Sequence, residues 1–258
     1  MTAIDIFIVV NGLVLGSFLY TTALRLQNKK ALWKRSKCPM CGNPVAVFGL
    51  LPILGYLFQR GRCARCQGKI SRTYPIIELI NAILLYLIFI RTGWSVDFLR
   101  FTLLFEVLLV IAILDFKTHL IFPQPVVFGV ITQTICLFFL DRNEIINALL
   151  GLFLGAGIFH WIAYLYRVLR NRVGLGEGDA TLLGLIGFGF GWGVLFSTIF
   201  WAALIGILGG AILLITKRQS LTNEIAFGPW LAAATFLVWF QPDFFQSFPF
   251  GAPFTLSF

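Results

Sequence analysis

The chain has 258 residues, of which 59% are hydrophobic and 12% are charged, and its formal net charge is +9. A water-soluble domain normally carries about 25% charged residues, so this composition excludes an ordinary soluble domain. The positive charge is concentrated, because eleven Lys and Arg and no acidic residue lie between Arg25 and Arg72. A basic block directly after an apolar segment is typical of a cytoplasmic loop in a membrane protein. No RNA- or DNA-binding signature accompanies it, so we expect no nucleic-acid partner.

The sequence contains eight apolar segments that we propose as membrane spans. About 20 residues are needed to cross the roughly 30 Å of bilayer hydrocarbon. The first segment has no basic flank before it and is too long for the core of a signal peptide, so we expect a retained span. The sixth is short and rich in glycine, a composition that allows close helix packing in lipid. The eight segments are residues 5–24, 75–91, 98–116, 122–140, 145–167, 180–194, 196–216 and 227–246.

The basic loop carries two Cys-x-x-Cys pairs separated by 21 residues, Cys38 with Cys41 and Cys63 with Cys66. Each pair can place two thiolates on one tight turn, and the four sulfurs together predict a tetrahedral Zn²⁺ site. Two disulfides are the alternative, which a cytoplasmic location disfavours because thiols stay reduced there. Four thiolates would fill the coordination shell, so we expect the zinc to be structural.

The sequence therefore predicts an all-α polytopic membrane protein of about eight transmembrane helices with a small cytoplasmic zinc-binding loop domain. We divide it into a first transmembrane helix (1–24), a basic loop with the four-cysteine zinc site (25–74) and a seven-helix membrane domain (75–258). If the basic loop is cytoplasmic and the spans alternate, seventeen Lys and Arg lie on the cytoplasmic side and three outside. The positive-inside rule favours this orientation, which places the N-terminus in the periplasm.

Two aspartates fall on the cytoplasmic side in this topology. Asp115 ends the third span and Asp179 directly precedes the sixth. A carboxylate near hydrocarbon is costly and is usually retained for a function, so we expect these two to meet at the membrane edge. Two carboxylates within a few ångströms resist double ionisation and hold one proton between them. The ionised member can then deprotonate a water while the protonated member hydrogen-bonds a substrate carbonyl.

Neighbouring residues complete this hypothesis. Gly176 and Gly178 precede Asp179 and would let an extended substrate backbone approach it. Glu78 stands near the start of the second span, where an acid is favourable beside a helix N-terminus. The alternative function is a proton-coupled transporter or an assembly scaffold that docks through a zinc-stabilised loop. Such carriers usually place their acids near mid-membrane and show internal repeats, and neither feature is evident in this sequence.

A series of short motifs runs along nearly the whole chain. The motifs are Gly16-Ser17-Phe18-Leu19, the two cysteine pairs, Gly61-Arg62-Cys63 leading to Tyr74-Pro75 and Glu78, Asp115 ahead of a proline-containing loop, Gly176-Glu177-Gly178-Asp179, and Phe227-Gly228-Pro229. In this order and spacing the chain resembles the type IV prepilin peptidases, the leader peptidases and N-methyltransferases of bacterial inner membranes.

The resemblance implies an aspartic protease of the GxGD type with Asp115 and Asp179 as the catalytic pair. It implies that the substrates are precursors of type IV pilins or pseudopilins, which lose a basic leader at the cytoplasmic membrane face. It also implies methylation of the new N-terminus with S-adenosylmethionine as the methyl donor. The chain departs from the family pattern at Tyr20, Gln124 and Thr181, where Asn, Asp and Lys are common.

Overall fold

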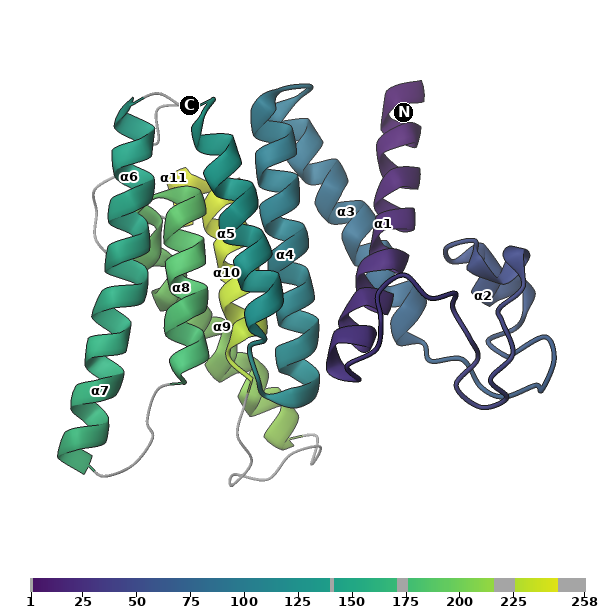
Figure 1. The fold of residues 1–258 in the computed structure, drawn as a ribbon. Coiled ribbons are helices and arrows are strands. Elements are labelled where there is room, and N and C mark those ends of the chain that lie inside the picture. The colour runs from purple at the N-terminus through teal and green to yellow at the C-terminus, as the bar shows by residue number, and fades with distance from the viewer. Residues whose placement is uncertain (1, 140–141, 171–175, 216–225, 246–258) are drawn as a thin grey trace. The chain divides into compact units, whose positions relative to one another are not determined.

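The computed structural model describes residues 2–139, 142–170, 176–215 and 226–245. Within these ranges the regular elements are helices (Figure 1), and the β-pairing is limited to two isolated bridges. The predicted all-α fold is therefore confirmed. The elements are α1 (Ala3–Gln27), η1 (Val47–Leu50), α2 (Leu54–Phe58), α3 (Thr73–Thr92), α4 (Val96–Thr118), α5 (Pro123–Leu137), α6 (Arg142–Leu152), η2 (Phe153–Ile158), α7 (Phe159–Arg170), α8 (Glu177–Phe190), α9 (Gly193–Ile215), α10 (Gly228–Phe240) and α11 (Pro242–Phe245).

A helix is present at each of the predicted apolar segments, but the helices differ in length. α4 has 23 residues and carries charged side chains along its length. Three apolar helices have 10–17 residues, namely Pro123–Leu137, Gly178–Phe190 and Gly228–Phe240. Among the residues that the structure describes, four stretches are long and apolar enough to cross a membrane, namely Ala3–Gln27, Thr73–Thr92, Arg142–Leu169 and Gly193–Ile212. That all eight segments cross the bilayer stays a prediction.

The chain forms two compact units, Met1–Phe98 and Leu99–Phe258. In the first unit α1 and α3 pack antiparallel through a face of small residues. A Cβ on Gly12 would lie 2.6 Å from the Cα of Ala82, and a Cβ on Gly16 would lie 2.9 Å from the Cα of Glu78. Glycine at both positions allows this close approach of the two backbones. The predicted division into 1–24, 25–74 and 75–258 stays a prediction.

α8 is the central helix of the second unit, where it packs against α5, α6, η2, α9 and α10 (Figure 1). All of its residues from 182 to 190 are buried. A Cβ on Gly151 of α6 would collide with the Gly187 carbonyl group, and a Cβ on Gly155 of η2 would collide with the Leu183 carbonyl group. Helices surround α8 on several sides. Its buried side chains therefore contact protein and not lipid, and the helix does not have to match the thickness of the bilayer. This explains why the sixth apolar segment is short and rich in glycine.

The bounds of α8 differ from the predicted span of 180–194. The helix begins at Glu177, so Asp179 lies in its first turn instead of preceding it. It ends at Phe190, because Gly191 adopts a φ of +83°, an extended positive-φ conformation that only glycine adopts readily and that cannot continue a helix. Hydropathy detects only the apolar part of a helix and therefore missed the polar first turn.

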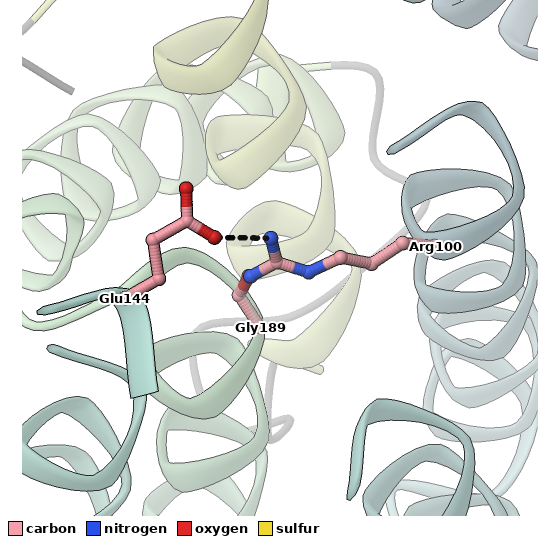
Figure 2. A network of polar contacts seen from close by, with 3 residues as sticks. All are labelled: Arg100, Glu144 and Gly189. Carbon is pink, nitrogen blue, oxygen red and sulfur yellow. Dashed lines mark hydrogen bonds and ion pairs between the residues drawn. The ribbon is translucent and has the colours of Figure 1, made fainter. Parts of the chain in front are cut away.

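Arg100, in the first turns of α4, joins the far end of α8 to two neighbouring helices (Figure 2). Its Nη2 donates a hydrogen bond of 2.7 Å to the carbonyl oxygen of Gly189 in the last turn of α8. Its Nη1 lies 3.9 Å from Oε2 of Glu144 on α6. Arg100 is one of the three basic residues counted on the outer side, and because it is buried it makes a structural contact inside the protein. A cation is also favourable beside the C-terminal carbonyl groups of a helix.

We expect Arg100→Met to lower the free energy of unfolding by about 2 kcal/mol, because a hydrogen bond from a charged donor to a buried carbonyl is lost. Thermal unfolding of the full chain in detergent would measure this as a lower melting temperature. Arg142→Met is the matched control, since Arg142 is exposed on α6. An equal loss in both variants would contradict a specific role for the Arg100 contact.

Candidate active site and four-cysteine site

The four cysteines of the basic loop form one cluster, as the sequence predicted. The sulfur atoms of Cys38, Cys41, Cys63 and Cys66 all lie within 4.8 Å of one another. The Sγ atoms of Cys38 and Cys66 are 3.8 Å apart, and the four thiols are free. A tetrahedron with metal–sulfur bonds of about 2.3 Å has sulfur–sulfur edges of about 3.8 Å. The cluster therefore has the donors and the spacing to hold a metal ion.

Two similar turns present these sulfurs. The backbone N–H of Cys38 donates to the Asn43 carbonyl and that of Cys63 to the Gly68 carbonyl. The fourth residue after each first cysteine has a positive φ, +69° at Gly42 and +58° at Gln67. The left-handed residue closes each turn, and an antiparallel bridge flanks each turn.

Backbone donors prepare two of the thiols for metal binding. The N–H groups of Cys66 and Arg65 lower the pKa of the Cys63 thiol to about 6. The Asn43 N–H lowers the pKa of the Cys41 thiol. The thiolate is the form that ligates a metal, so these donors favour the ligating state at Cys41 and Cys63, whereas the neighbouring thiols raise the pKa of Cys66 to about 11.

Asp115 lies in the last turns of α4 and is buried. Its Oδ2 accepts a hydrogen bond of 2.8 Å from the backbone N–H of Gly228 at the start of α10. A Cβ on Gly228 would lie 2.8 Å from the same oxygen, so a side chain there would crowd the carboxylate. The role of Gly228 was missed in the sequence analysis, although its motif was noted, because its partner is 113 residues away.

Asp179 lies in the first turn of α8 and is half-buried. Its backbone N–H donates to the Gly176 carbonyl at 3.1 Å, and a Cβ on Gly176 would lie 3.0 Å from Oδ2 of Asp179. A Cβ on Gly178 would lie 2.9 Å from the Cβ of Ile121, in the segment that connects α4 to α5. The two glycines thus make room for the carboxylate and for the contact of α8 with this segment.

The structure brings the two aspartates to one end of the second unit. α4 ends and α8 begins at the same end (Figure 1). Asp179 lies within electrostatic range of the Asp115 carboxylate. The charge count predicted that Asp115 and Asp179 lie on the same side, and the structure agrees with this placement. Their catalytic role stays a prediction.

Glu78 lies near the start of its helix, as the sequence predicted, and it makes a contact that the sequence did not indicate. It lies in the second turn of α3 and is buried. Its Oε2 accepts a hydrogen bond of 2.7 Å from the backbone N–H of Ile53, and the Ser17 hydroxyl contacts the same carboxylate. Glu78 therefore attaches the loop that carries the cysteines to the α1–α3 pair.

Comparison with known proteins identifies the family. Residues 10–92 match the bacterial peptidase A24 N-terminal domain and residues 102–211 match the type IV leader peptidase family. The chain is 33% identical over 242 residues to a prepilin leader peptidase/N-methyltransferase of Bacillus subtilis, which covers 92% of this chain and 94% of the relative. The chain belongs to the type IV leader peptidase family. It is thus a member of the prepilin-processing peptidases, and the predicted resemblance is confirmed.

Other relatives with the same name have similar coverage. The relative from Pseudomonas putida is 30% identical over 246 residues, 86% of this chain and 85% of its own length. The relative from Neisseria gonorrhoeae is 30% identical over 210 residues, 81% of this chain and 71% of its own length. No solved structure matches the chain.

The three departures from the family pattern lie in different surroundings. Tyr20 is buried in α1 and packs edge-to-face on Tyr74 of α3, with ring centroids 4.6 Å apart. The larger residue thus fills the helix interface. Gln124 in the first turn of α5 and Thr181 in the second turn of α8 are exposed.

We expect Gly228→Ala to slow prepilin cleavage by about tenfold or more. The added methyl group would displace the Asp115 carboxylate from its N–H donor, and a hydrogen bond to a charged group stabilises by about 1.5–3 kcal/mol, which corresponds to tenfold or more in rate. Gly157→Ala is the control, since a Cβ there meets open space. Equal cleavage rates in the two variants would show that the Gly228 contact does not matter.

Proposed function

We propose that this chain is a membrane aspartic endopeptidase that removes the basic leader from type IV prepilins or pseudopilins, and that it also N-methylates the new N-terminus. The observation that carries the proposal is the placement of Asp115 and Asp179 at one end of the second unit, each beside a glycine that leaves room for its carboxylate. The family membership of the chain supports the substrate class.

In the proposed reaction the aspartate pair holds one proton, which belongs to the pair and not to either residue. The ionised carboxylate takes a proton from a water molecule as its oxygen attacks the scissile carbonyl carbon, while the protonated carboxyl donates a hydrogen bond to the carbonyl oxygen. The tetrahedral intermediate then collapses, the C–N bond breaks, and the leaving nitrogen takes up a proton from the pair. One water is consumed and the pair returns to its starting state. The Gly228 N–H holds Oδ2 of Asp115, which fixes that carboxylate against the substrate.

The proposed location is the bacterial inner membrane, with the N-terminus in the periplasm and the aspartates at the cytoplasmic face. The uneven distribution of Lys and Arg supports this orientation. A prepilin has a basic leader before an apolar helix, so its cleavage site would reach the membrane face on which the aspartates lie.

For the metal, we propose a structural Zn²⁺ held by Cys38, Cys41, Cys63 and Cys66. Zinc supplies a cross-link between the two cysteine turns, and the four thiolates of the cluster match its preferred tetrahedral shell. No reaction step runs through this site, because four sulfurs leave no coordination position for water.

S-adenosylmethionine is the proposed methyl donor, because the relatives are named N-methyltransferases. Among the described residues, two surface hollows lie along η2 and α7. Apolar side chains such as Phe153 and Leu165 line the first, and His160, Tyr164 and Arg167 line the second.

We expect Asp115→Asn or Asp179→Asn to reduce leader cleavage by about 10²–10⁴-fold, the range for loss of an acid–base group. Cleavage of a prepilin by the purified variants in liposomes measures this. Asp243→Asn is the control, since Asp243 is an exposed carboxylate of α11. Methylation of a leaderless pilin peptide by the same variants would show that they remain folded. Full cleavage by either variant would refute the aspartate pair.

A second prediction concerns the metal. The Cys38→Ser/Cys63→Ser variant should lose its zinc by elemental analysis while it retains most of the leader cleavage, because the cysteines and the aspartates lie in different units. Cys136→Ser removes the cysteine of α5 and should keep the zinc. An unchanged zinc content in the double variant would exclude the four-sulfur site.

A further inference from the structure

The basic loop contains a second feature besides the cysteine cluster, the short apolar pair η1 and α2. Five large side chains on this pair are exposed, and we call them the η1–α2 face. They are Phe48, Leu50, Leu54, Leu57 and Phe58, with exposed fractions of 78%, 51%, 51%, 60% and 76%. Exposed apolar side chains on membrane helices contact lipid, but a loop in the cytosol would expose this face to water.

The backbone explains why these side chains point outward. η1 and α2 pack against each other through glycine, since a Cβ on Gly55 would lie 2.8 Å from the backbone of Gly49. Tyr56 closes the other side over Gly61, where a Cβ would lie 2.7 Å from the Tyr56 hydroxyl oxygen. With glycine at the contact, the larger residues of α2 are left on the outer surface.

The position of α2 along the axes of α1 and α3 indicates what covers the η1–α2 face. The Ile53 N–H, directly before α2, donates to Glu78 in the second turn of α3. Glu78 lies against Gly16, which is eleven residues before the end of α1 at Gln27, or about 16 Å along the helix axis. Gly16 belongs to the apolar run of α1, and Arg25 marks the polar end. Figure 1 shows α2 beside the α1–α3 pair and not beyond its end.

The contact to Glu78 is specific enough to hold α2 at this level. Ile53 has a φ of +57°, an unfavourable conformation for a β-branched residue. The hydrogen bond to a buried carboxylate compensates for this strain. α2 is therefore held at the depth of the apolar part of the helices.

Charge complementarity identifies the kind of lipid. Arg60 and Arg62 directly follow Phe58 and are exposed. The segment from Arg25 to Arg72 contains no acidic residue that could pair with them. Basic residues beside an apolar face are typical of elements that lie in the interface of an anionic membrane.

We propose that the η1–α2 face is inserted into the bilayer interface, with its side chains among the acyl chains and Arg60 and Arg62 at anionic lipid phosphates. The cysteine cluster is then anchored to the membrane surface at α2 as well as through α1 and α3. This inference does not depend on the peptidase chemistry, because it concerns only the first unit.

Photo-crosslinking of the zinc-loaded full chain tests the insertion. Phe58 is replaced by benzoylphenylalanine in one sample and the exposed Ala64, in the second cysteine turn, in another. Both are placed in nanodiscs of phosphatidylcholine mixed with phosphatidylglycerol. We expect several-fold more lipid adduct at position 58 than at position 64 by mass spectrometry. Retained zinc content confirms that the loop is folded in both samples.

Crosslinks from position 58 to the same chain, to a second copy or to an added prepilin, in place of lipid, would overturn the proposal, as would the absence of adducts. The charge component is tested by Arg60→Gln/Arg62→Gln and by nanodiscs of phosphatidylcholine alone. Each change should lower the lipid adduct at position 58. An adduct yield that responds to neither change would overturn the binding of anionic lipid.

Discussion

The backbone-to-backbone packing of α8 against α6 and η2 fixes the geometry on which the candidate active site depends. Gly151, Gly155 and Gly187 leave no room for side chains between these helices. Arg100 ties the opposite end of α8 to α4. These contacts hold α8 along its whole length. They therefore fix the position of Asp179, in the first turn of α8, relative to the end of α4. A catalytic pair must be held to within about 0.5 Å, so contacts far from the carboxylates determine whether they can act together.

A glycine lies next to three of the acidic residues described above. Gly228 offers its N–H to Asp115, Gly176 leaves room for the carboxylate of Asp179, and Gly16 lies against the backbone at Glu78. Next to hydrocarbon a carboxylate has no water to solvate it, so backbone donors and close packing must replace hydration. At Asp115 and at Asp179 a glycine accordingly stands directly beside the carboxylate.

Features that depend on neighbouring residues, or on a sum over many residues, could be predicted from the sequence. Apolar runs located the helices, the spacing of Cys38, Cys41, Cys63 and Cys66 located the cluster, and the charge count placed Asp115 and Asp179 on one side. Contacts with a partner that is distant in the chain could not be predicted. The contact between Gly228 and Asp115 spans 113 residues, and neither the Glu78–Ile53 bond nor the buried place of Arg100 leaves a periodic pattern. The first turn of α8 was missed because hydropathy records apolar residues and not helical backbone.

The central claim is that Asp115 and Asp179 hold one proton between them. Infrared spectroscopy of the full chain in liposomes, with aspartate carboxyl groups labelled with ¹³C, measures this directly near neutral pH. The account predicts an isotope-shifted C=O stretching band of a protonated aspartic acid that disappears in both Asp115→Asn and Asp179→Asn. A spectrum with no such band, or a band that survives both substitutions, would contradict it.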